Sequence, residues 1–220
     1  MTRILGLDEA GRGSVIGPLV VGGFVVDSER IDELVGTGAT DSKVLDPESR
    51  ERILLELPHL GVCDTVVLPP REIDRYVALG RLNDLEAHAF GTLVARLAPE
   101  EVHADACDTD PRRFARTIAK SCGGVGARIL ASHHADRDDP IVGAASIVAK
   151  VRRDRAIARL SRQLGVEVGS GYPSDPRTIA FLKERLGREY GMPAWVRGSW
   201  ATMQRVIPER PARTLDAFET

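Results

Sequence analysis

Cysteines, aromatic residues and long apolar runs are all scarce in this sequence. Its 220 residues include only three cysteines and 5% aromatic side chains. Cys63, Cys107 and Cys122 are odd in number and widely spaced, a pattern that predicts neither a disulfide framework nor a CxxC metal or redox site. No segment reaches the ~18 uncharged apolar residues of a membrane span, and the first residues lack a signal-peptide core. We therefore expect a soluble, cytoplasmic protein with reduced thiols and no membrane partner.

The net charge is only −2, but the two signs are unevenly distributed along the chain. Residues 1–149 carry 16 basic and 24 acidic side chains, whereas residues 150–213 carry 14 basic and 6 acidic ones. A basic C-terminal third beside an acidic remainder could hold a polyanion next to a group of carboxylates. A solvated basic helix face is an equally ordinary cause of the same asymmetry.

Apolar periodicity and turn residues predict alternating strands and helices without an internal repeat. Strand-like runs cover 4–7, 19–26, 62–68, 101–106 and 127–131, and the first two are expected to form a buried hairpin. Helical patterns cover 47–57, 72–79, 83–97, 111–121, 140–164 and 176–188, with Asp46 and Asp110 as N-caps. This order indicates an α/β fold, with a mixed central sheet flanked by helices and a helical C-terminal part.

Four acidic residues end or follow these predicted strands. Asp8 and Glu9 end the first strand, Asp105 lies near the end of 101–106, and Asp136 lies in the loop before the helix at 140. Carboxylates at strand ends converge at one edge of a sheet, and hard divalent cations such as Mg²⁺ require oxygen ligands. Two such ions can activate water and stabilise the leaving oxygen in phosphodiester hydrolysis. Taken singly, each acid is better explained as a turn or cap residue, so the prediction rests on the four together. Helix capping is the expected role of the neighbouring Asp108, Asp138 and Asp139.

A glycine-rich turn, Gly11-Arg12-Gly13, directly follows the first pair of acids. Its two glycines let the backbone approach a ligand closely, and Arg12 adds a charged fork. Because adjacent strand residues point to opposite faces, Asp8 and Glu9 can share a site only where the strand breaks into this turn. The spacing matches neither GxxxxGK[ST] nor GxGxxG, which argues against a nucleotide-binding loop.

Seven further motifs complete an ordered pattern over nearly the whole chain. They are Ile16-Gly17-Pro18, Asp41-Ser42-Lys43, Asn83-Asp84-Leu85-Glu86, Asp105-Ala106-Cys107-Asp108, His134-Ala135-Asp136 ahead of 144–154, Gly169-Ser170-Gly171-Tyr172-Pro173, and Arg197-Gly198-Ser199-Trp200. Together with the DEAGRG string at 8–13, this set resembles type 2 ribonuclease H (ribonuclease HII), particularly the archaeal branch of that family. The resemblance implies that the mixed sheet is ribonuclease H-like.

The resemblance also implies a role for individual residues. The metal-binding and catalytic acids would be Asp8, Glu9, Asp105 and Asp136. The substrate-binding residues would be Gly11, Arg12 and Gly13 in a ribose-sensing turn, Tyr172 at the RNA–DNA junction, and Lys43 and Lys150 at backbone phosphates. A closely approaching backbone turn suits this role because the 2′-hydroxyl is the group that distinguishes RNA from DNA. A purely packing role remains the alternative for Tyr172. A phosphate-tracking face is expected from Lys150, Arg152, Arg153, Arg155, Arg159 and Arg162. Some of these arginines are expected to pair instead with neighbours such as Asp154.

The function implied is that of a metal-dependent endoribonuclease that uses Mg²⁺ or Mn²⁺ and serves DNA replication and repair. Such an enzyme hydrolyses the RNA strand of RNA/DNA hybrids and cuts 5′ of ribonucleotides embedded in duplex DNA, leaving a 3′-hydroxyl and a 5′-phosphate. One alternative is a non-catalytic nucleic-acid-binding protein, in which four acids would face a polyanion at an electrostatic cost. Another is an enzyme of different phosphate chemistry, such as a phosphatase, for which the GRG turn and Tyr172 have no evident use.

The chain is expected to divide into a catalytic domain at 1–207, which includes the helical C-terminal part, and a loose tail at 208–220. Leu215 and Phe218 lie three residues apart and would share one face of a helical turn. The tail resembles the C-terminal motif by which archaeal replication and repair enzymes bind the sliding clamp (PCNA), although Ala212 and Glu219 depart from that motif. A frayed helix that packs on its own domain is the alternative. We expect a monomer.

Overall fold

A mixed five-stranded sheet forms the centre of the molecule. The computed structural model describes residues 1–39, 45–188 and 191–206. The strands are β1 (Arg3–Ala10), β2 (Leu19–Asp27), β3 (Gly61–Leu68), β4 (Glu101–Asp105) and β5 (Arg128–Ser132), in the order β3-β2-β1-β4-β5. β1, β2 and β3 are antiparallel neighbours, whereas β4 runs parallel to β1 and β5 runs parallel to β4. The predicted hairpin and mixed sheet are confirmed.

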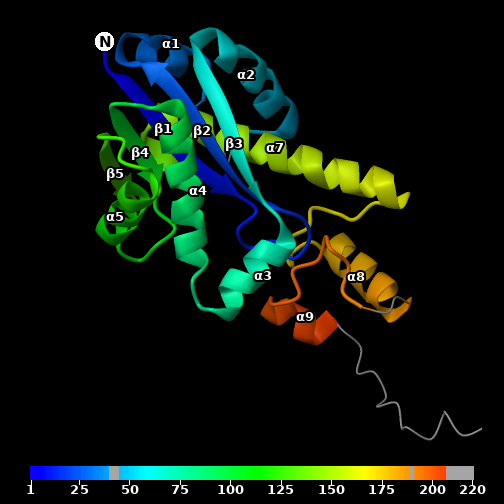
Figure 1. Ribbon diagram of the computed structural model, residues 1–220. Helices are drawn as coiled ribbons and strands as arrows, with labels where there is room; N and C mark the ends of the chain where they lie inside the picture. The colour runs from blue at the N-terminus through cyan, green and yellow to red at the C-terminus, as the bar shows by residue number, and fades with distance from the viewer. Residues whose placement is uncertain (40–44, 189–190, 207–220) are drawn as a thin grey trace, which may run out of the picture.

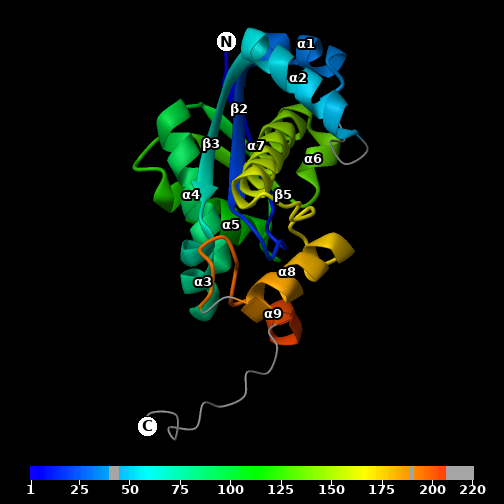
Figure 2. The ribbon, with the colours of Figure 1, turned by 90° about the vertical axis from the view of Figure 1, so that its right-hand side faces the viewer.

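Helices cover both faces of this sheet (Figures 1 and 2). The longer helices are α2 (Pro47–Leu60), α3 (Pro70–Ala78), α4 (Leu82–Leu97), α5 (Pro111–Ser121), α7 (Pro140–Leu164) and α8 (Pro176–Arg188). The shorter ones are η1 (Ser28–Arg30), α1 (Ile31–Gly36), α6 (Ala135–Asp138) and α9 (Ala201–Val206). α4 and α5 share one apolar core with the sheet, and α1, α2 and α7 share a second core with its other face.

The alternation of side chains along β2 separates these two cores. Val25 packs in the core beneath α4, whereas its neighbours Phe24 and Val26 pack in the core beneath α7. Gly22 allows α7 to lie close to the sheet, because a Cβ at this position would be 2.4 Å from the carbonyl oxygen of Ala145. The small-residue first half of α7 is therefore the part that packs against β1 and β2, and it leaves the arginine-rich second half to extend beyond the sheet (Figure 1).

Four helices begin with an aspartate followed by proline; the fourth is α8, where Asp175 accepts a hydrogen bond from the N–H of Arg177 at 3.0 Å. Asp46, Asp110 and Asp139 each accept backbone N–H hydrogen bonds from the first turn of α2, α5 and α7, respectively. The predicted caps at Asp46 and Asp110 and the capping role of Asp139 are confirmed. The expected capping role is wrong for Asp108 and Asp138. Asp108 instead pairs with Arg113, and Asp138 is the last residue of α6.

The helical C-terminal part packs beneath the sheet on the segment that follows β1 (Figure 2). The carbonyl oxygen of Gly171 accepts hydrogen bonds from the N–H groups of Val15 at 2.8 Å and Ile16 at 3.2 Å. Ile16 also forms an isolated antiparallel bridge with Val196. These contacts place the segments around residues 171 and 197 beside the Gly11–Gly13 turn, although they are far apart in the sequence.

The short helices α1, α6 and α9 were not expected from the sequence. Each spans only four to six residues, too few for an apolar period to appear. The correction matters for Asp136, which lies in α6 rather than in a loop. The three cysteines are free, as the sequence predicts. Within the described residues, no helix is long and apolar enough to cross a membrane.

Candidate active site

The four predicted acids come from three neighbouring elements. Asp8 and Glu9 lie in the last half of β1, and Asp105 is the last residue of β4, which runs parallel to β1. The Asp105 carboxylate accepts a hydrogen bond from the N–H of Ala135, and Asp136 is the next residue in α6. Asp8 and Asp136 are buried, with 4% and 1% of their surface exposed. The acids therefore gather at the carboxyl ends of β1 and β4.

Asp8 and Glu9 are not in a strand that breaks, contrary to the sequence-based expectation. Both are paired in register with β2, opposite Gly22 and Val21. Consecutive strand residues point to opposite sides, and the two carboxylates accordingly have different surroundings. Asp8 lies near Ser146 and Lys150 of α7, and Glu9 lies near Glu86 and Arg12. The charges of the two carboxylates nevertheless interact with each other and with Asp105, so both acids adjoin one site although the strand is intact.

Burial and mutual repulsion disfavour negative charge on both β1 acids. The pKa of Asp8 is raised to about 7, mainly by burial; the charge of Asp105 also raises it, whereas Ser146 and Lys150 lower it. Burial followed by the charge of Asp8 holds the pKa of Glu9 well above its usual range. A bound cation would relieve this repulsion and favour the ionised carboxylates.

The donor set fits hard divalent cations. Carboxylate oxygens are the ligands that Mg²⁺ and Mn²⁺ prefer, and Mg²⁺ typically takes one or two of them together with water and substrate phosphate oxygens. Glu9 Oε2 is buried and has no hydrogen-bond partner among the described residues. Among the described residues, no group of three or more His, Cys, Asp or Glu side chains is arranged closely enough to hold a metal ion as it stands.

The Gly11–Gly13 turn is closed by Ser14. The N–H of Ser14 and its hydroxyl both donate to the carbonyl oxygen of Gly11, at 3.2 and 2.8 Å. Gly11 has a φ of +88°, which glycine adopts without strain, and a Cβ there would be 2.9 Å from the carbonyl oxygen of Pro18. Gly13 is exposed, and apart from its two chain neighbours no described residue has an atom within 4 Å of its Cβ position. The turn is therefore fixed at its base and open at its tip.

Buried charged residues hold Arg12 from two sides. Its guanidinium donates to Asn83 Oδ1 at 2.7 Å and forms an ion pair with Glu86, whose side chain is fully buried. Its carbonyl oxygen accepts a hydrogen bond from Arg197 Nη1 at 2.8 Å, while Arg197 Nε donates to Gly17 at 3.0 Å. No role was predicted for Glu86 or Arg197 from the sequence, because charged residues are ordinarily expected at the surface. The sequence hinted at their importance only by placing them in the motifs at 83–86 and 197–200.

The remaining predicted substrate contacts are distributed around the turn. Lys150 is a half-buried residue of α7 near Asp8, and Tyr172 lies in the loop between α7 and α8. Lys43 lies outside the described residues. Of the expected basic face, Arg152, Arg159 and Arg162 are exposed, and Arg155 is exposed in an ion pair with Glu51. Arg153 is not part of this face: it is 3% exposed and pairs with Asp154 at 3.5 Å, as the sequence predicted for some of these arginines.

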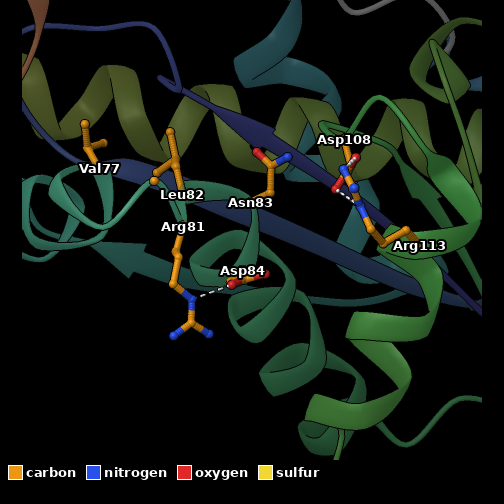
Figure 3. Close-up of a pocket in the computed structure, with 8 residues that line it drawn as sticks. Val77, Arg81, Leu82, Asn83, Asp84, Asp108 and Arg113 are labelled. Atoms are coloured by element: carbon orange, nitrogen blue, oxygen red, sulfur yellow. Dashed lines mark hydrogen bonds and ion pairs between the residues drawn. The ribbon is translucent and has the colours of Figure 1, made fainter.

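A pocket of about 540 Å³ lies between the beginning of α4 and the beginning of α5 (Figure 3). It is lined by Val77, Gly80, Arg81, Leu82, Asn83, Asp84, Asp108 and Arg113. Arg81 pairs with Asp84 at 2.7 Å, and the hydrogen bond from Arg113 is the main cause that lowers the pKa of Asp108 to about 2. Asn83 lines this pocket and also accepts the hydrogen bond from Arg12. The pocket therefore adjoins the turn through Asn83. Its two arginines, Arg81 and Arg113, both have acidic partners.

The chain is similar to known proteins over nearly its whole length. The family model described as Ribonuclease HII matches residues 5–203. Ribonuclease HII of Methanoregula boonei is 43% identical, covering 98% of this chain and 99% of the relative. The corresponding protein of Thermococcus kodakarensis is 44% identical, covering 93% and 89%.

Solved structures agree with this relationship. The crystal structure of ribonuclease H2 from Pyrococcus horikoshii OT3 gives a TM-score of 0.85 at 40% identity, covering 93% of this chain and 96% of that one. The ribonuclease HII in a PCNA complex from Archaeoglobus fulgidus gives 0.83 at 37% identity, covering 98% and 100%. A Bst ribonuclease HIII in complex with Mn²⁺ shares the fold, with a TM-score of 0.81 at 20% identity over 93% of this chain and 69% of that one.

Proposed function

Because the chain belongs to the ribonuclease HII family, we propose that it is a metal-dependent endoribonuclease acting on RNA within duplexes that contain DNA. It hydrolyses the RNA strand of RNA/DNA hybrids and cuts 5′ of ribonucleotides embedded in duplex DNA. The products carry a 3′-hydroxyl and a 5′-phosphate. This activity would serve DNA replication and repair.

The observation that carries the proposal is the gathering of four acids at the carboxyl ends of β1 and β4. Asp8, Glu9, Asp105 and Asp136 would hold Mg²⁺ or Mn²⁺. The ions would supply water activation and stabilisation of the leaving oxygen. The protein itself keeps Asp8 and Asp136 buried and orders Asp105 through Ala135, so that the carboxylates need little rearrangement when substrate arrives.

Recognition of RNA would depend on the Gly11–Gly13 turn and on Tyr172. The tip of the turn is open at Gly13, which allows its backbone to approach a ribose 2′-hydroxyl. Tyr172 would contact the sugar at the junction between RNA and DNA. Lys43, Lys150 and the exposed arginines of α7 would contact phosphates, which give affinity without sequence preference.

Product mapping tests this proposal against a non-catalytic nucleic-acid binder. The substrates are matched duplexes with no ribonucleotide, with one, and with four in succession, each incubated with Mg²⁺, Mn²⁺ or EDTA. We expect a cut 5′ of the ribonucleotide in either metal and none in EDTA or in the all-DNA duplex. Binding without cleavage in both metals would refute the enzyme, and a 2′,3′-cyclic phosphate product would refute the proposed chemistry.

We further propose that residues 1–207 act as one catalytic domain, working as a monomer, and that 208–220 bind the sliding clamp. Leu215 and Phe218, which would carry the contact, lie outside the described residues. Support comes from the A. fulgidus relative, which is known in a complex with PCNA. Deletion of 214–220 should leave cleavage of a short duplex unchanged and abolish co-elution with the clamp. Undiminished clamp binding, or a destabilised domain, would refute the proposal.

A further inference from the structure

Arg153 occupies an unusual position for a residue of the arginine-rich half of α7. Its neighbours Arg152, Asp154 and Arg155 are exposed, whereas Arg153 is 3% exposed. Its side chain lies against Tyr172 and against the Gly11–Gly13 turn. We propose that Arg153 is a positioning residue that sets selectivity for a single ribonucleotide by holding Tyr172 against the ribose-sensing turn. The inference rests on the proposed function of the same site.

The guanidinium of Arg153 contacts Tyr172 and its loop in two ways. Its central carbon lies 4.4 Å from the centroid of the Tyr172 ring, a cation–π arrangement. Its Nη2 donates to the carbonyl oxygen of Ser170 at 2.5 Å. One side chain therefore fixes both the face of the ring and the backbone two residues before it.

The same guanidinium also lies against the turn. A Cβ added to Gly11 would be 3.1 Å from Arg153 Nε, so the Gly11 backbone and this side chain are in close contact. A Cβ added to Gly171 would be 2.7 Å from Arg153 Nη2, and Gly171 in turn receives hydrogen bonds from Val15 and Ile16. Arg153 is thus packed between two backbone segments that the proposed function assigns to ribose recognition.

Charge compensation alone does not explain an arginine at this position. The ion pair with Asp154 spans 3.5 Å, and Asp154 keeps 49% of its side chain exposed. Arg153 Nε is buried without a hydrogen-bond partner among the described residues. Burying a guanidinium in this way is unfavourable unless other contacts compensate, and here those contacts are the Tyr172 ring and the Ser170 carbonyl.

This arrangement should matter most when the substrate offers one ribonucleotide. Arg153 lies over the ring face of Tyr172, so the proposed contact with the sugar would be made by the phenol hydroxyl at the ring edge. Small misplacements of a positioning group can reduce turnover about 100-fold. A duplex with four successive ribonucleotides offers several binding registers and tolerates a loosely held tyrosine better than a duplex with only one.

A double-mutant cycle on the full-length protein tests the inference. Arg153→Met, Arg153→Lys, Tyr172→Ala and both Arg153→Met/Tyr172→Ala are compared by kcat/KM on duplexes with one and with four ribonucleotides. Selectivity is kcat/KM on the duplex with one ribonucleotide divided by kcat/KM on the duplex with four. We expect Arg153→Met to lower selectivity about tenfold or more, since it removes both contacts to Tyr172 and Ser170. Arg153→Lys should recover part of it because the charge over the ring remains. Arg116→Met, on the exposed surface of α5, serves as the control for loss of an arginine.

The decisive result is the effect of Arg153→Met in the Tyr172→Ala background. If Arg153 acts through Tyr172, the double variant has the selectivity of Tyr172→Ala alone. Equal losses on the two substrates, or independent effects that multiply, would overturn the inference. Thermal unfolding shows whether Arg153→Met is misfolded. If it is, the same comparison is made with Arg153→Lys alone and combined with Tyr172→Ala. A wild-type protein that cleaves neither duplex would instead refute the proposed function.

Discussion

Asp105 and Ala135 are joined by a hydrogen bond, in which the backbone N–H of Ala135 donates to Asp105 Oδ1 at 2.9 Å. The bond connects the end of β4 to the first residue of α6. Since Asp136 follows Ala135 directly, the same bond fixes the backbone that carries the fourth acid beside the third. One carboxylate oxygen thus has a structural task in addition to its proposed part in metal binding.

Two substitutions of Asp105 separate the structural task from the chemical one. Asparagine keeps an acceptor for the Ala135 N–H, whereas alanine removes it, and both remove the charge. We expect Asp105→Ala to be less stable than Asp105→Asn by about 1 kcal/mol in urea unfolding, the typical contribution of one hydrogen bond. Both variants should lose cleavage. Equal stability of the two would show that the bond does not support the fold.

Gly13→Ala should separate substrate binding from folding. Among the described residues only the two chain neighbours of Gly13 have atoms within 4 Å of its Cβ position, so we expect a change in unfolding free energy within about 0.5 kcal/mol. The added methyl group would stand where the backbone approaches the ribose, and cleavage of a single-ribonucleotide duplex should fall at least about tenfold. Unchanged cleavage would contradict the role of this turn in ribose recognition.

Gly22→Ala tests the close packing of α7 on β2. Its Cβ would be 2.4 Å from the Ala145 carbonyl oxygen and 2.7 Å from the Ala149 nitrogen, so the helix would have to move. We expect a loss of about 1–3 kcal/mol in unfolding free energy, as overpacked cores show. Gly36→Ala, at an open position in α1, is the control and should cause no loss. Equal stability of the two variants would contradict the packing described.

His103 provides a pH-dependent contribution to stability. Its Nε2 is 2.8 Å from Glu101 Oε1 and its Nδ1 contacts Asp139 Oδ2, while Glu101 also pairs with Arg128. The hydrogen bond to Asp139 is the largest cause that raises the His103 pKa above 6.5. A raised pKa means that the charged form is stabilised by folding, so the contribution is complete below pH 6.5 and is lost as pH rises through the higher value.

Thermal unfolding of wild type and His103→Gln checks this dependence. We expect the difference in Tm to be largest near pH 6 and to shrink by pH 9. His59→Gln, which changes an exposed histidine of α2, should show no such trend. A difference in Tm that is constant with pH would contradict a charged His103 in the folded protein.

Strong local signals explain why most of the fold could be predicted from the sequence. The bounds of α5 and α7 are as predicted because each helix has an aspartate N-cap followed by proline. The hairpin of β1 and β2 followed from uninterrupted apolar runs. The four-residue α6 gave no such signal, which is why Asp136 was placed in a loop.

The acids of the site could be proposed from their positions at strand ends, but their supporting residues could not be inferred in the same way. Glu86, Arg153 and Arg197 are all buried. Arg153 belongs to a stretch predicted to be a basic face, and the motifs around Glu86 and Arg197 gave no sign of burial. Their burial depends on the contacts of Arg12 with Glu86 and Arg197 and of Arg153 with Tyr172, which form only in the folded chain. Their charge therefore predicted exposed side chains, whereas the structure buries them.

The most direct test of the central proposal is the cleavage rate of a single-ribonucleotide duplex by wild type, Asp8→Asn and Asp136→Asn in saturating Mg²⁺. An amide keeps the shape of the carboxylate and removes its charge, so both variants should fold as wild type does by circular dichroism. We expect each rate to fall more than about 100-fold, because the ions lose a charged ligand. A near-wild-type rate for either variant would contradict the assignment of these acids as the metal site.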